Sequence, residues 1–383
     1  MVSNQVAIEF LEERYGIEVT DLKPLPSYDD QNLLVTGTWK GSRKTKKYVM
    51  KIACRGDSVG DLQLENEAMR ILAEKRIILK IPGGLNVEVD TPDVIRGENG
   101  LIERLDAKRL GYLSNEVAKE MVGFKYLPVR VVTYLDGKVM AKVPQTPQLL
   151  QELGSSLGQM DRILKDWQPV SDAKKRTIAW DLMNAEKTIE TKLKFVERLE
   201  NGERKTLLVN EFLRKYRQCA KDTHLKLRES FVHNDANDYN VLVHDNHISG
   251  IIDFGDLVYT KLVNNVAIAA AYAMLGSQDD PVAALVHVAV GYNSSLQLEP
   301  EEIGILYYLS CLRICQSVVS SAFEQTRDPE NKYILVSAKP GWACLEKLYT
   351  TKCEDQPTER LFAALKVRDV QQCSRACKQC AVC

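Results

Sequence analysis

The chain has 383 residues, of which 45% are hydrophobic and 27% are charged, and its formal net charge is -1. This length is enough for two domains with substantial cores, and the composition is ordinary for a globular protein. A charge so close to zero gives no reason to expect nucleic acid or an anionic membrane as a partner. No protein partner is implied either.

The sequence shows no targeting or membrane segment. Its longest apolar runs, "VAIAAAYAML" and "PVAALVHVAV", are about ten residues long, whereas a bilayer needs roughly 18 to 20. The N-terminus "MVSNQVAIEFLEERYG" has no basic flank, which argues against a signal peptide and predicts an amphipathic helix instead. Six of the ten cysteines are scattered, mostly within apolar segments, as is typical of reduced, buried thiols in a cytoplasmic protein.

The first third of the chain predicts a small sheet. The segments "NLLVTGTW" and "KYVMKIA" have strand character and flank the turn "KGSRKTK", which is a hairpin signal. The following "GDLQLENEAMRILAEKRI" has apolar residues at helical spacing. Residues 81–123 give no clear pattern, and "KYLPVRVVTYLDGK" then predicts a buried strand that ends at Asp136 and Gly137.

From about Thr146 onward the patterns predict helices. "TPQLLQELGSSLGQMDRIL" begins with a Thr and a Pro at the N-cap and first turn, and "KRTIAWDLMNAEKTIETKLKFVERLE" predicts one long helix or a pair. Three apolar helical segments follow residue 262. We therefore expect an α+β protein with a sheet-rich lobe over residues 1–136, a hinge near 131–137, a larger helical lobe over 137–365 and a flexible tail over 366–383.

One stretch, "FVHNDANDYNVLVHDNHISGIIDFGD", combines many polar residues with strand-forming ones. If Asp245 and Asn246 form the turn of a hairpin, His244 pairs with His247, and continued alternation puts Val241 opposite Gly250. In that register Asn240 and Asp253 lie on one face at the open end of the hairpin. Two oxygen ligands at one point suit Mg²⁺, which takes one or two protein ligands beside phosphates and water.

The residues just before the hairpin match a kinase catalytic loop. His233 and Asp235 precede Asn240 with the spacing H-x-D-x-x-x-x-N, and Asp253 begins the tripeptide D-F-G. Asp235 would accept the proton of the acceptor hydroxyl, Asn240 and Asp253 would hold the metal, and His233 would brace the loop. His244 and His247 read as ordinary residues beside a turn.

A kinase also needs a lysine that reaches the nucleotide phosphates and a helix glutamate that holds this lysine. Lys51 lies in the otherwise apolar strand "YVMKIA", where an unpaired ammonium group would be costly. The next helix offers Glu65 and Glu67, of which Glu65 is the favoured partner.

The acceptor is expected to be a small molecule. After D-F-G the chain runs almost at once into an apolar helix, so the long activation segment of protein kinases, which ends in A-P-E, is missing. The motifs "FVHNDANDYNVLV" and "ISGIIDFGDLVYTKLVNNVAIAAAYAML" resemble the aminoglycoside phosphotransferase and choline kinase superfamily. Together with "YGIEVTDLKPLPSYDDQNLLV" and "IAWDLMNA", they are most similar to the hydroxylysine kinase family, over most of residues 10–350.

This resemblance implies a bilobal protein-kinase-like fold that transfers phosphate to the hydroxyl of 5-hydroxy-L-lysine. It implies Mg²⁺ and GTP as the phosphate donor, although no residue pattern favours GTP over ATP. By position, Asp235 corresponds to the catalytic base, Asn240 and Asp253 to the metal ligands, and Lys51 to the phosphate-binding lysine. The hinge residues that would meet the nucleotide base are Thr133 and Leu135.

The phosphate-covering loop departs from the family pattern, because "SYDDQN" stands where a glycine pair is expected. Ser27 is the residue that offers a contact to a phosphate, whereas the acidic pair Asp29 and Asp30 is unfavourable beside a polyanion. An acceptor with two amines and one carboxylate needs acidic side chains. The candidates are Asp238, Asp256 and Asp181.

The four cysteines of the tail "QQCSRACKQCAVC" could bind zinc but lack the usual spacing of a structural site, and the last four residues resemble a prenylation box with an atypical final residue. No site is assigned to the tail. Two rivals to the hydroxylysine kinase interpretation stay open. One is a kinase for another amino alcohol, such as homoserine, choline or an aminoglycoside. The other is a catalytically silent kinase-like binding module, which the complete set of Lys51, Asp235, Asn240 and Asp253 disfavours.

Overall fold

The computed structural model describes residues 2–27, 30–53, 58–81, 85–106, 126–169, 171–277, 279–327, 336–351 and 356–367. The cysteine-rich tail and the loop residues Tyr28 and Asp29 lie outside these ranges. The chain forms two compact units. The first combines Met1–Glu74 with Thr91–Asp136, and the second combines Lys75–Asp90 with Gly137–Cys383.

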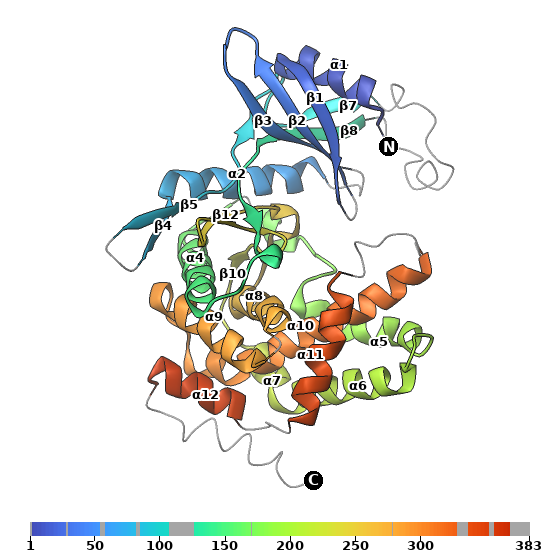
Figure 1. Cartoon of the computed structure of the whole chain (residues 1–383), viewed down its shortest axis with the longest axis vertical. Helices are drawn as coiled ribbons and strands as arrows, with labels where there is room; N and C mark the ends of the chain where they lie inside the picture. The colour runs from blue at the N-terminus through green and yellow to red at the C-terminus, as the bar shows by residue number, and fades with distance from the viewer. Residues whose placement is uncertain are drawn as a thin grey trace. The chain divides into compact units, whose positions relative to one another are not determined.

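Within its described residues, the first unit is an antiparallel sheet with two helices (Figure 1). The sheet has six strands in the order β1-β2-β3-β8-β6, and β7 also pairs with β8. The helices are α1 (Asn4–Tyr15) and α2 (Val59–Lys75), and the strands are β1 (Ile17–Leu25), β2 (Gln31–Trp39), β3 (Thr45–Ile52), β6 (Val94–Ile95), β7 (Glu103–Asp106) and β8 (Tyr126–Thr133). Strands β2 and β3 form the expected hairpin, and β8 is the strand expected before the hinge.

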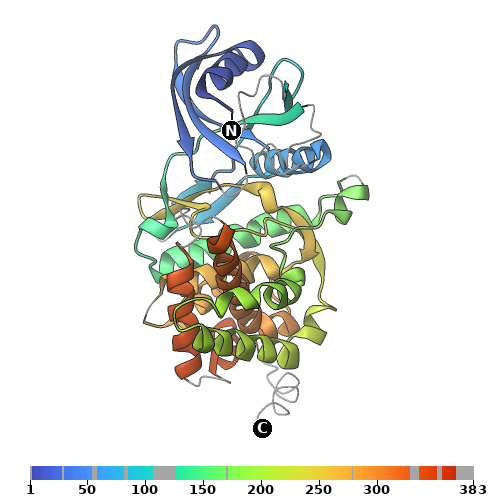
Figure 2. The same cartoon turned by 90° about the vertical axis from the view of Figure 1, so that its right-hand side faces the viewer.

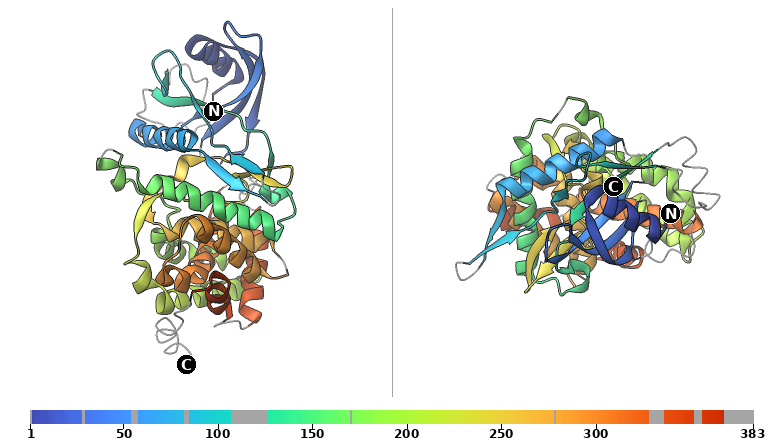
Figure 3. Two further views of the ribbon diagram at one scale, coloured as in Figure 1. Left: turned by 90° about the vertical axis from the view of Figure 1, so that its left-hand side faces the viewer. Right: turned by 90° about the horizontal axis from the view of Figure 1, so that it is seen from above.

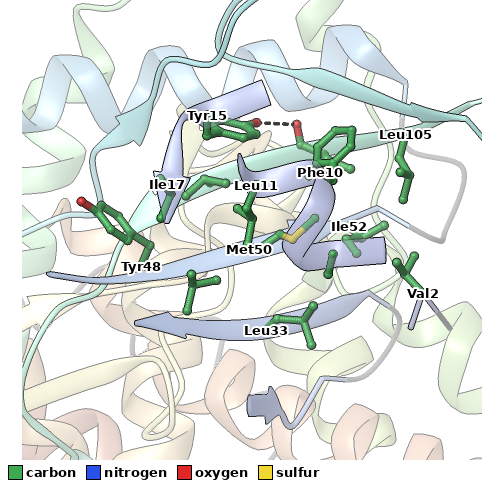
Figure 4. Packing of buried hydrophobic residues seen from close by; sticks show 14 of the residues in the cluster. Val2, Phe10, Leu11, Tyr15, Ile17, Leu33, Tyr48, Met50, Ile52 and Leu105 are labelled. Atoms are coloured by element: carbon green, nitrogen blue, oxygen red, sulfur yellow. Dashed lines mark hydrogen bonds between the residues drawn. The ribbon is translucent and has the colours of Figure 1, made fainter. Parts of the chain in front are cut away.

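Helix α1 covers one face of this sheet. It starts at Ser3, whose hydroxyl accepts a hydrogen bond from the Val6 amide, and it ends at Gly16 in the left-handed conformation that glycine tolerates best. Phe10 and Leu11 pack onto the apolar face of the sheet (Figure 4). The Tyr15 hydroxyl also donates to the carbonyl of Val129 on β8 (3.2 Å). Side chains that alternate with this core therefore point to the opposite face of the sheet.

A short hairpin, β4 (Ile77–Lys80) and β5 (Asn86–Val89), belongs to the second unit, although the sequence predicted one unbroken lobe over residues 1–136. Gln159 exchanges two hydrogen bonds with the backbone of Ile78 (3.0 and 2.8 Å). Asp90 bonds through its backbone to Ser249 and Ile251 (2.9 and 3.0 Å). These backbone pairings join residues distant in sequence, so no local sequence pattern predicts them.

The second unit is mostly helical. Its remaining strands and 3-10 helices are β9 (Lys138–Val139), η2 (Met140–Lys142), η3 (Ser171–Lys175), η4 (Leu182–Asn184), β10 (Glu229–Val232), β11 (Val241–His244), β12 (His247–Ile251), η5 (Phe254–Asp256) and β13 (Val258–Lys261). Its α-helices are α4 (Pro147–Lys165), α5 (Ala185–Val196), α6 (Gly202–Cys219), α7 (Lys221–His224), α8 (Val263–Gly276), α9 (Pro281–Ser295), α10 (Pro300–Arg327), α11 (Ala338–Thr350) and α12 (Gln356–Leu365).

Helices α4 and α9 lie side by side in the second unit (Figure 3). The Thr146 hydroxyl caps α4 by accepting a bond from the Leu149 amide (3.2 Å), as the sequence predicted. A Cβ atom at Gly154 would lie 2.0 Å from the Val288 carbonyl oxygen, and one at Gly291 would lie 1.9 Å from that of Gln151. Only glycine therefore permits this close approach of the two backbones.

Helix α10 is the central helix of the second unit and packs against α5, α6, α8 and α11; α5 and α6 face the viewer in Figure 2. By length and composition α10 is apolar enough to cross a membrane, which the short apolar runs did not predict. Its most apolar 18-residue window is 94% buried inside the protein. That degree of burial is what a core helix requires.

The helix predicted over residues 175–200 forms only in its second part. The segment Ile178–Asp181 forms turns, η4 follows, and the α-helix begins at Ala185. Asp181 starts η4, because its carboxylate accepts a bond from the Met183 amide (3.1 Å). An Asp side chain that accepts a bond from a backbone amide two residues later favours a helix start over a helix interior.

Candidate active site

The hairpin at the heart of the predicted site is present, with one irregularity. His244 pairs with His247 as expected, but a β-bulge then shifts the register so that Val241 lies opposite Ile251 and not opposite Gly250. Ser249 is the extra residue in β12, and the backbone of Asp90 bonds to Ser249 and Ile251, on either side of Gly250. The expected alternation was therefore wrong beyond the first two pairs, because this third segment pairs with the bulged strand.

Asn240 and Asp253 both lie near Asp235 at the open end of the hairpin. The Ile252 amide donates to the Asn240 carbonyl (2.9 Å), which extends the ladder by one step. Asp253 follows with φ 65° and ψ 78°, a left-handed conformation that turns its side chain out of the strand alternation. Both predicted ligands thus lie near the Asp235 carboxylate, and their shared role in holding a metal stays a prediction.

The carboxylate of Asp235 is the centre of this cluster. Its Oδ2 accepts hydrogen bonds from the side-chain amides of Asn237 (2.9 Å) and Asn240 (2.8 Å). Its Oδ1 accepts a bond from the guanidinium group of Arg313 on α10 (3.0 Å). The side chain of Asp235 keeps 22% of its surface exposed, so the carboxylate is held firmly while one side of it stays accessible.

Burial is the main reason that the pKa of Asp235 is raised to about 7, and the negative charges of Asp256 and Asp253 add to it. The positive charge of Arg313 and the hydrogen bond from Asn237 act in the opposite direction. Three carboxylates thus lie close enough to influence one another. A carboxylate whose pKa is near neutral is suited to take up a proton during a reaction.

His233 braces the loop, as the sequence predicted. Its Nδ1 accepts a bond from the Asp235 amide (3.2 Å), and its Nε2 donates to the Ile252 carbonyl (3.0 Å). The ring also packs edge-on against Phe254, with 4.7 Å between the ring centroids. The histidine therefore ties the residue before the D-F-G tripeptide to the catalytic loop.

The donor set fits a magnesium ion. The amide nitrogen of Asn240 donates to both the carbonyl and the carboxylate of Asp235 (2.9 and 2.8 Å), which makes the amide oxygen the atom available to a cation. An amide oxygen and a carboxylate are the hard ligands that Mg²⁺ prefers. Within the described residues no three His, Cys, Asp or Glu side chains gather as a metal site, and a site of one amide and one carboxylate does not require that.

In the first unit, Lys51 lies in β3 opposite Asn32 of β2 and Arg130 of β8. Opposed residues share a face, so these side chains lie away from the α1 core. The sequence predicted that Glu65 would hold Lys51. In the structure Glu65 forms a buried ion pair with Arg130, which also donates to Asn66 (3.1 Å). The pairing of Glu65 with Lys51 stays a prediction.

The remaining nucleotide-site predictions fall in loops or at strand ends. Ser27 is half-buried in the loop after β1. Thr133 is the last residue of β8, and its hydroxyl accepts a bond from the Asp93 amide (2.9 Å). Leu135 lies two residues later and is partly exposed. Their contacts with a nucleotide stay predictions.

The three acidic substrate candidates occupy different environments. Asp256 ends η5 beside Asp235, while burial raises the pKa of Asp238, in the catalytic loop, to about 6. Asp181 is bound internally, because its Oδ1 also accepts bonds from Thr260 (2.8 Å) and Asn264 (3.3 Å). Asp256 therefore lies close enough to influence Asp235, Asp238 belongs to the same loop, and Asp181 is part of a buried polar network.

Known proteins similar to this chain show which family it belongs to. A model of the phosphotransferase enzyme family matches residues 21–295. The chain belongs to this family. Among curated relatives, it is 27% identical to the hydroxylysine kinase of Xenopus laevis, over 91% of this chain and 90% of the relative. It is 29% identical to the hydroxylysine kinase of Bos taurus, over 90% and 88% of the two chains.

Solved structures of other family kinases share the fold. An amicoumacin kinase in complex with AMP-PNP and Ca²⁺ superimposes with a TM-score of 0.62 at 16% identity, over 90% of this chain and 94% of that one. Spectinomycin phosphotransferase in complex with ADP and spectinomycin gives a TM-score of 0.58 at 14% identity, over 95% and 98%. The predicted α+β, bilobal kinase-like fold is confirmed, and the chain is a nucleotide-dependent phosphotransferase.

Two residues of this phosphotransferase site were missed. The motif gave Asn237 no role, yet its Oδ1 accepts bonds from the amides of Tyr239 (2.8 Å) and Asn240 (3.2 Å) while its side-chain amide donates to Asp235. Arg313 received no attention within its apolar segment. A charged residue in the middle of an apolar helix is costly unless it is paired, the same argument that singled out Lys51, and it would have identified this arginine.

Proposed function

We propose that the chain transfers the γ-phosphate of GTP to the hydroxyl of 5-hydroxy-L-lysine, giving 5-phosphohydroxy-L-lysine and GDP. The observation that carries the proposal is the Asp235 carboxylate, bonded to Asn240 and flanked by Asp253, in a chain similar along most of its length to hydroxylysine kinases. This constellation suits proton removal from an alcohol next to a metal-bound phosphate.

In the proposed reaction Asp235 accepts the proton of the acceptor hydroxyl as the oxygen bonds to the γ-phosphorus. The bond from that phosphorus to the bridging oxygen breaks, and GDP leaves with the electron pair. Asn240 and Asp253 would hold Mg²⁺, which neutralises charge that develops on the phosphates. His233 and Asn237 keep the loop in place while the proton moves.

The other residues have supporting roles in this proposal. Lys51 contacts the nucleotide phosphates, with Glu65 as its partner, and Ser27 contributes a hydroxyl there. Thr133 and Leu135 meet the base. ATP is the alternative donor, because no observed contact distinguishes the two nucleotides.

Recognition of the acceptor rests on charge. Asp256 and Asp238 lie beside the catalytic loop, where negative charge attracts the two amines of hydroxylysine. Asp181 is the third predicted contact. The cytoplasm is the proposed location, because it keeps the scattered cysteines reduced; Cys311, Cys315 and Cys344 are all buried free thiols.

The test is a panel of acceptors. The protein is incubated with Mg²⁺ and GTP or ATP, and nucleoside diphosphate release is followed with 5-hydroxy-L-lysine, homoserine, choline and an aminoglycoside. L-Lysine, which lacks only the hydroxyl, is the matched control. We expect turnover with hydroxylysine and none with lysine. Turnover with choline or homoserine but not hydroxylysine overturns the proposed acceptor, and no turnover with any acceptor indicates a binding module.

A further inference from the structure

Arg313 is the largest fully buried side chain of the protein's described part, with 1% of its surface exposed. It lies in the middle of α10, the apolar core helix of the second unit. Moving a guanidinium group out of water costs several kcal/mol unless the charge is paired and its donors are used. A core helix that carries such a group therefore needs a reason to keep it.

Hydrogen bonds and two aromatic rings hold the guanidinium group of Arg313 against Asp235. One nitrogen donates to the Trp180 carbonyl (2.6 Å) and another donates to Oδ1 of Asp235 (3.0 Å). The planar group lies over the Trp180 ring, 4.9 Å from its centroid, and 5.8 Å from that of Tyr272. The carbonyl and the rings hold the arginine, and the arginine in turn holds one oxygen of the carboxylate.

Arg313 differs from the other partners of Asp235 in where it comes from. Asn237 and Asn240 belong to the same loop as Asp235, and Asn240 is also a proposed metal ligand. Among the described residues, Arg313 is the one side chain that binds the Asp235 carboxylate from outside this loop. It therefore fixes the carboxylate relative to the core of the unit.

We propose that Arg313 is a positioning residue for phosphoryl transfer. It holds Oδ1 of Asp235 while the amides of Asn237 and Asn240 hold Oδ2, so that the exposed part of the carboxylate is fixed toward the acceptor hydroxyl. The inference rests on the proposed function, in which Asp235 takes the hydroxyl proton. Arg313 acts through Asp235 and touches neither the nucleotide nor the acceptor.

The variants Arg313→Gln and Arg313→Lys test this role in the full-length chain. We expect Arg313→Gln to lower kcat on the order of 10- to 100-fold with little change in the KM for the nucleotide, because misplacing a reacting group costs about this much. Arg313→Lys keeps the charge and is expected to recover part of the loss. Wild-type kcat in both variants overturns the inference.

A double variant separates positioning from a general structural role. If Arg313 acts through Asp235, adding Arg313→Gln to Asp235→Asn causes no further loss of kcat. A further loss as large as that of Arg313→Gln alone overturns the inference, because the arginine then acts independently of Asp235. If Arg313→Gln does not fold, the same comparison is made with Arg313→Lys.

Arg228→Gln is the matched control. Arg228 also pairs with α10, through two bonds to Glu302 (both 2.8 Å), but it does not contact Asp235. We expect this variant to unfold at a lower temperature and to keep its kcat. Equal losses of kcat in Arg228→Gln and Arg313→Gln would mean that loosening α10 is enough, and would overturn the inference.

Different results would overturn the role of Asp235 as the base and the role of Arg313 as a positioning residue. A fully active Asp235→Asn removes the proposed base. An inactive Asp235→Asn beside fully active Arg313 variants removes only the positioning role.

Discussion

Each unit of the protein contains a buried arginine that binds a carboxylate, and the two pairs are built differently. In the first unit, Arg130 and Glu65 are 3% and 1% exposed, so the pair is closed off from water. In the second unit Arg313 is as deeply buried, but the side chain of Asp235 keeps 22% of its surface exposed, and two further carboxylates lie near it.

The difference separates an ion pair that holds a fold together from one that holds a reacting group. The pair of Arg130 and Glu65 joins α2 to β8, and breaking a buried pair leaves a charge without compensation. The pair of Arg313 and Asp235 leaves one face of the acid open to a substrate. We therefore expect loss of Glu65 to reduce stability most, and loss of Asp235 to reduce activity most.

The largest effect is expected for Asp235→Asn. The amide keeps the shape of the side chain but cannot accept the proton, so kcat should fall by about 10² to 10⁴-fold. Nucleotide binding, measured by calorimetry, should stay near the wild-type value. The unfolding temperature should fall less than in the Glu65 variant, because the negative charge of Asp256 still lies near Arg313. A large loss of stability with unchanged kcat would reverse the comparison.

Glu65→Gln tests the closed pair. We expect the free energy of unfolding to fall by about 3 to 5 kcal/mol, because Arg130 then lies buried beside a neutral group. Chemical denaturation monitored by circular dichroism measures this change. The double variant Glu65→Leu with Arg130→Met removes both charges and should lose less stability than Glu65→Gln. An equal or greater loss in the double variant would show that packing, and not the unpaired charge, sets the cost.

Among the described residues, His224 is a buried titratable group without an opposite charge beside it, and it can be compared with the two buried ion pairs. His224 is fully buried, with its Nε2 bonded to Asn264 (2.7 Å) and its Nδ1 to the Tyr216 hydroxyl (3.0 Å). Burial lowers the pKa of His224 from 6.5 to about 4. The unfolded chain therefore binds a proton at a higher pH than the folded one, and stability present above pH 6.5 is lost as the pH falls toward 4.

The expected loss is about 3 kcal/mol at most, from 1.36 kcal/mol per unit of pKa difference. His224→Gln lacks this titration and serves as the reference. The stability advantage of the wild type over this variant should shrink between pH 6.5 and 4. An advantage that stays constant over that range would show that His224 is not buried as the neutral form.

The smallest effect is expected at the surface. Arg204 and Glu346 make two hydrogen bonds (3.0 and 2.6 Å), the same chemistry as the two buried pairs, but both side chains are well exposed. Water already solvates each charge, so Arg204→Ala should leave the unfolding temperature unchanged within experimental error. A drop comparable to that of Glu65→Gln would mean that burial is not what distinguishes the pairs.

Local sequence patterns located the loop and hairpin of the candidate site, but they did not identify the distant residue that binds Asp235. The order and spacing of His233, Asp235, Asn240 and Asp253 lie within one short stretch, so a sequence motif carries them. Arg313 is 78 residues beyond Asp235, and only the packing of α10 brings the two together. The same reason explains the hairpin of β4 and β5, whose partners lie far along the chain.

Some local expectations also failed for identifiable reasons. The bulge at Ser249 depends on pairing with Asp90, which a two-strand alternation does not include. The helix expected through Asp181 is broken because that side chain accepts a bond from the backbone amide of Met183. In both places a hydrogen bond outside the assumed pattern decided the local structure.

The central claim is that the carboxylate of Asp235 enables transfer of phosphate to 5-hydroxy-L-lysine. Phosphorus NMR of a reaction with GTP, Mg²⁺ and the acceptor observes the product directly. The account predicts a new phosphomonoester signal with the wild-type protein and almost none with Asp235→Asn in the same time. A signal that grows equally fast with the variant, or that never appears with the wild type, would contradict it.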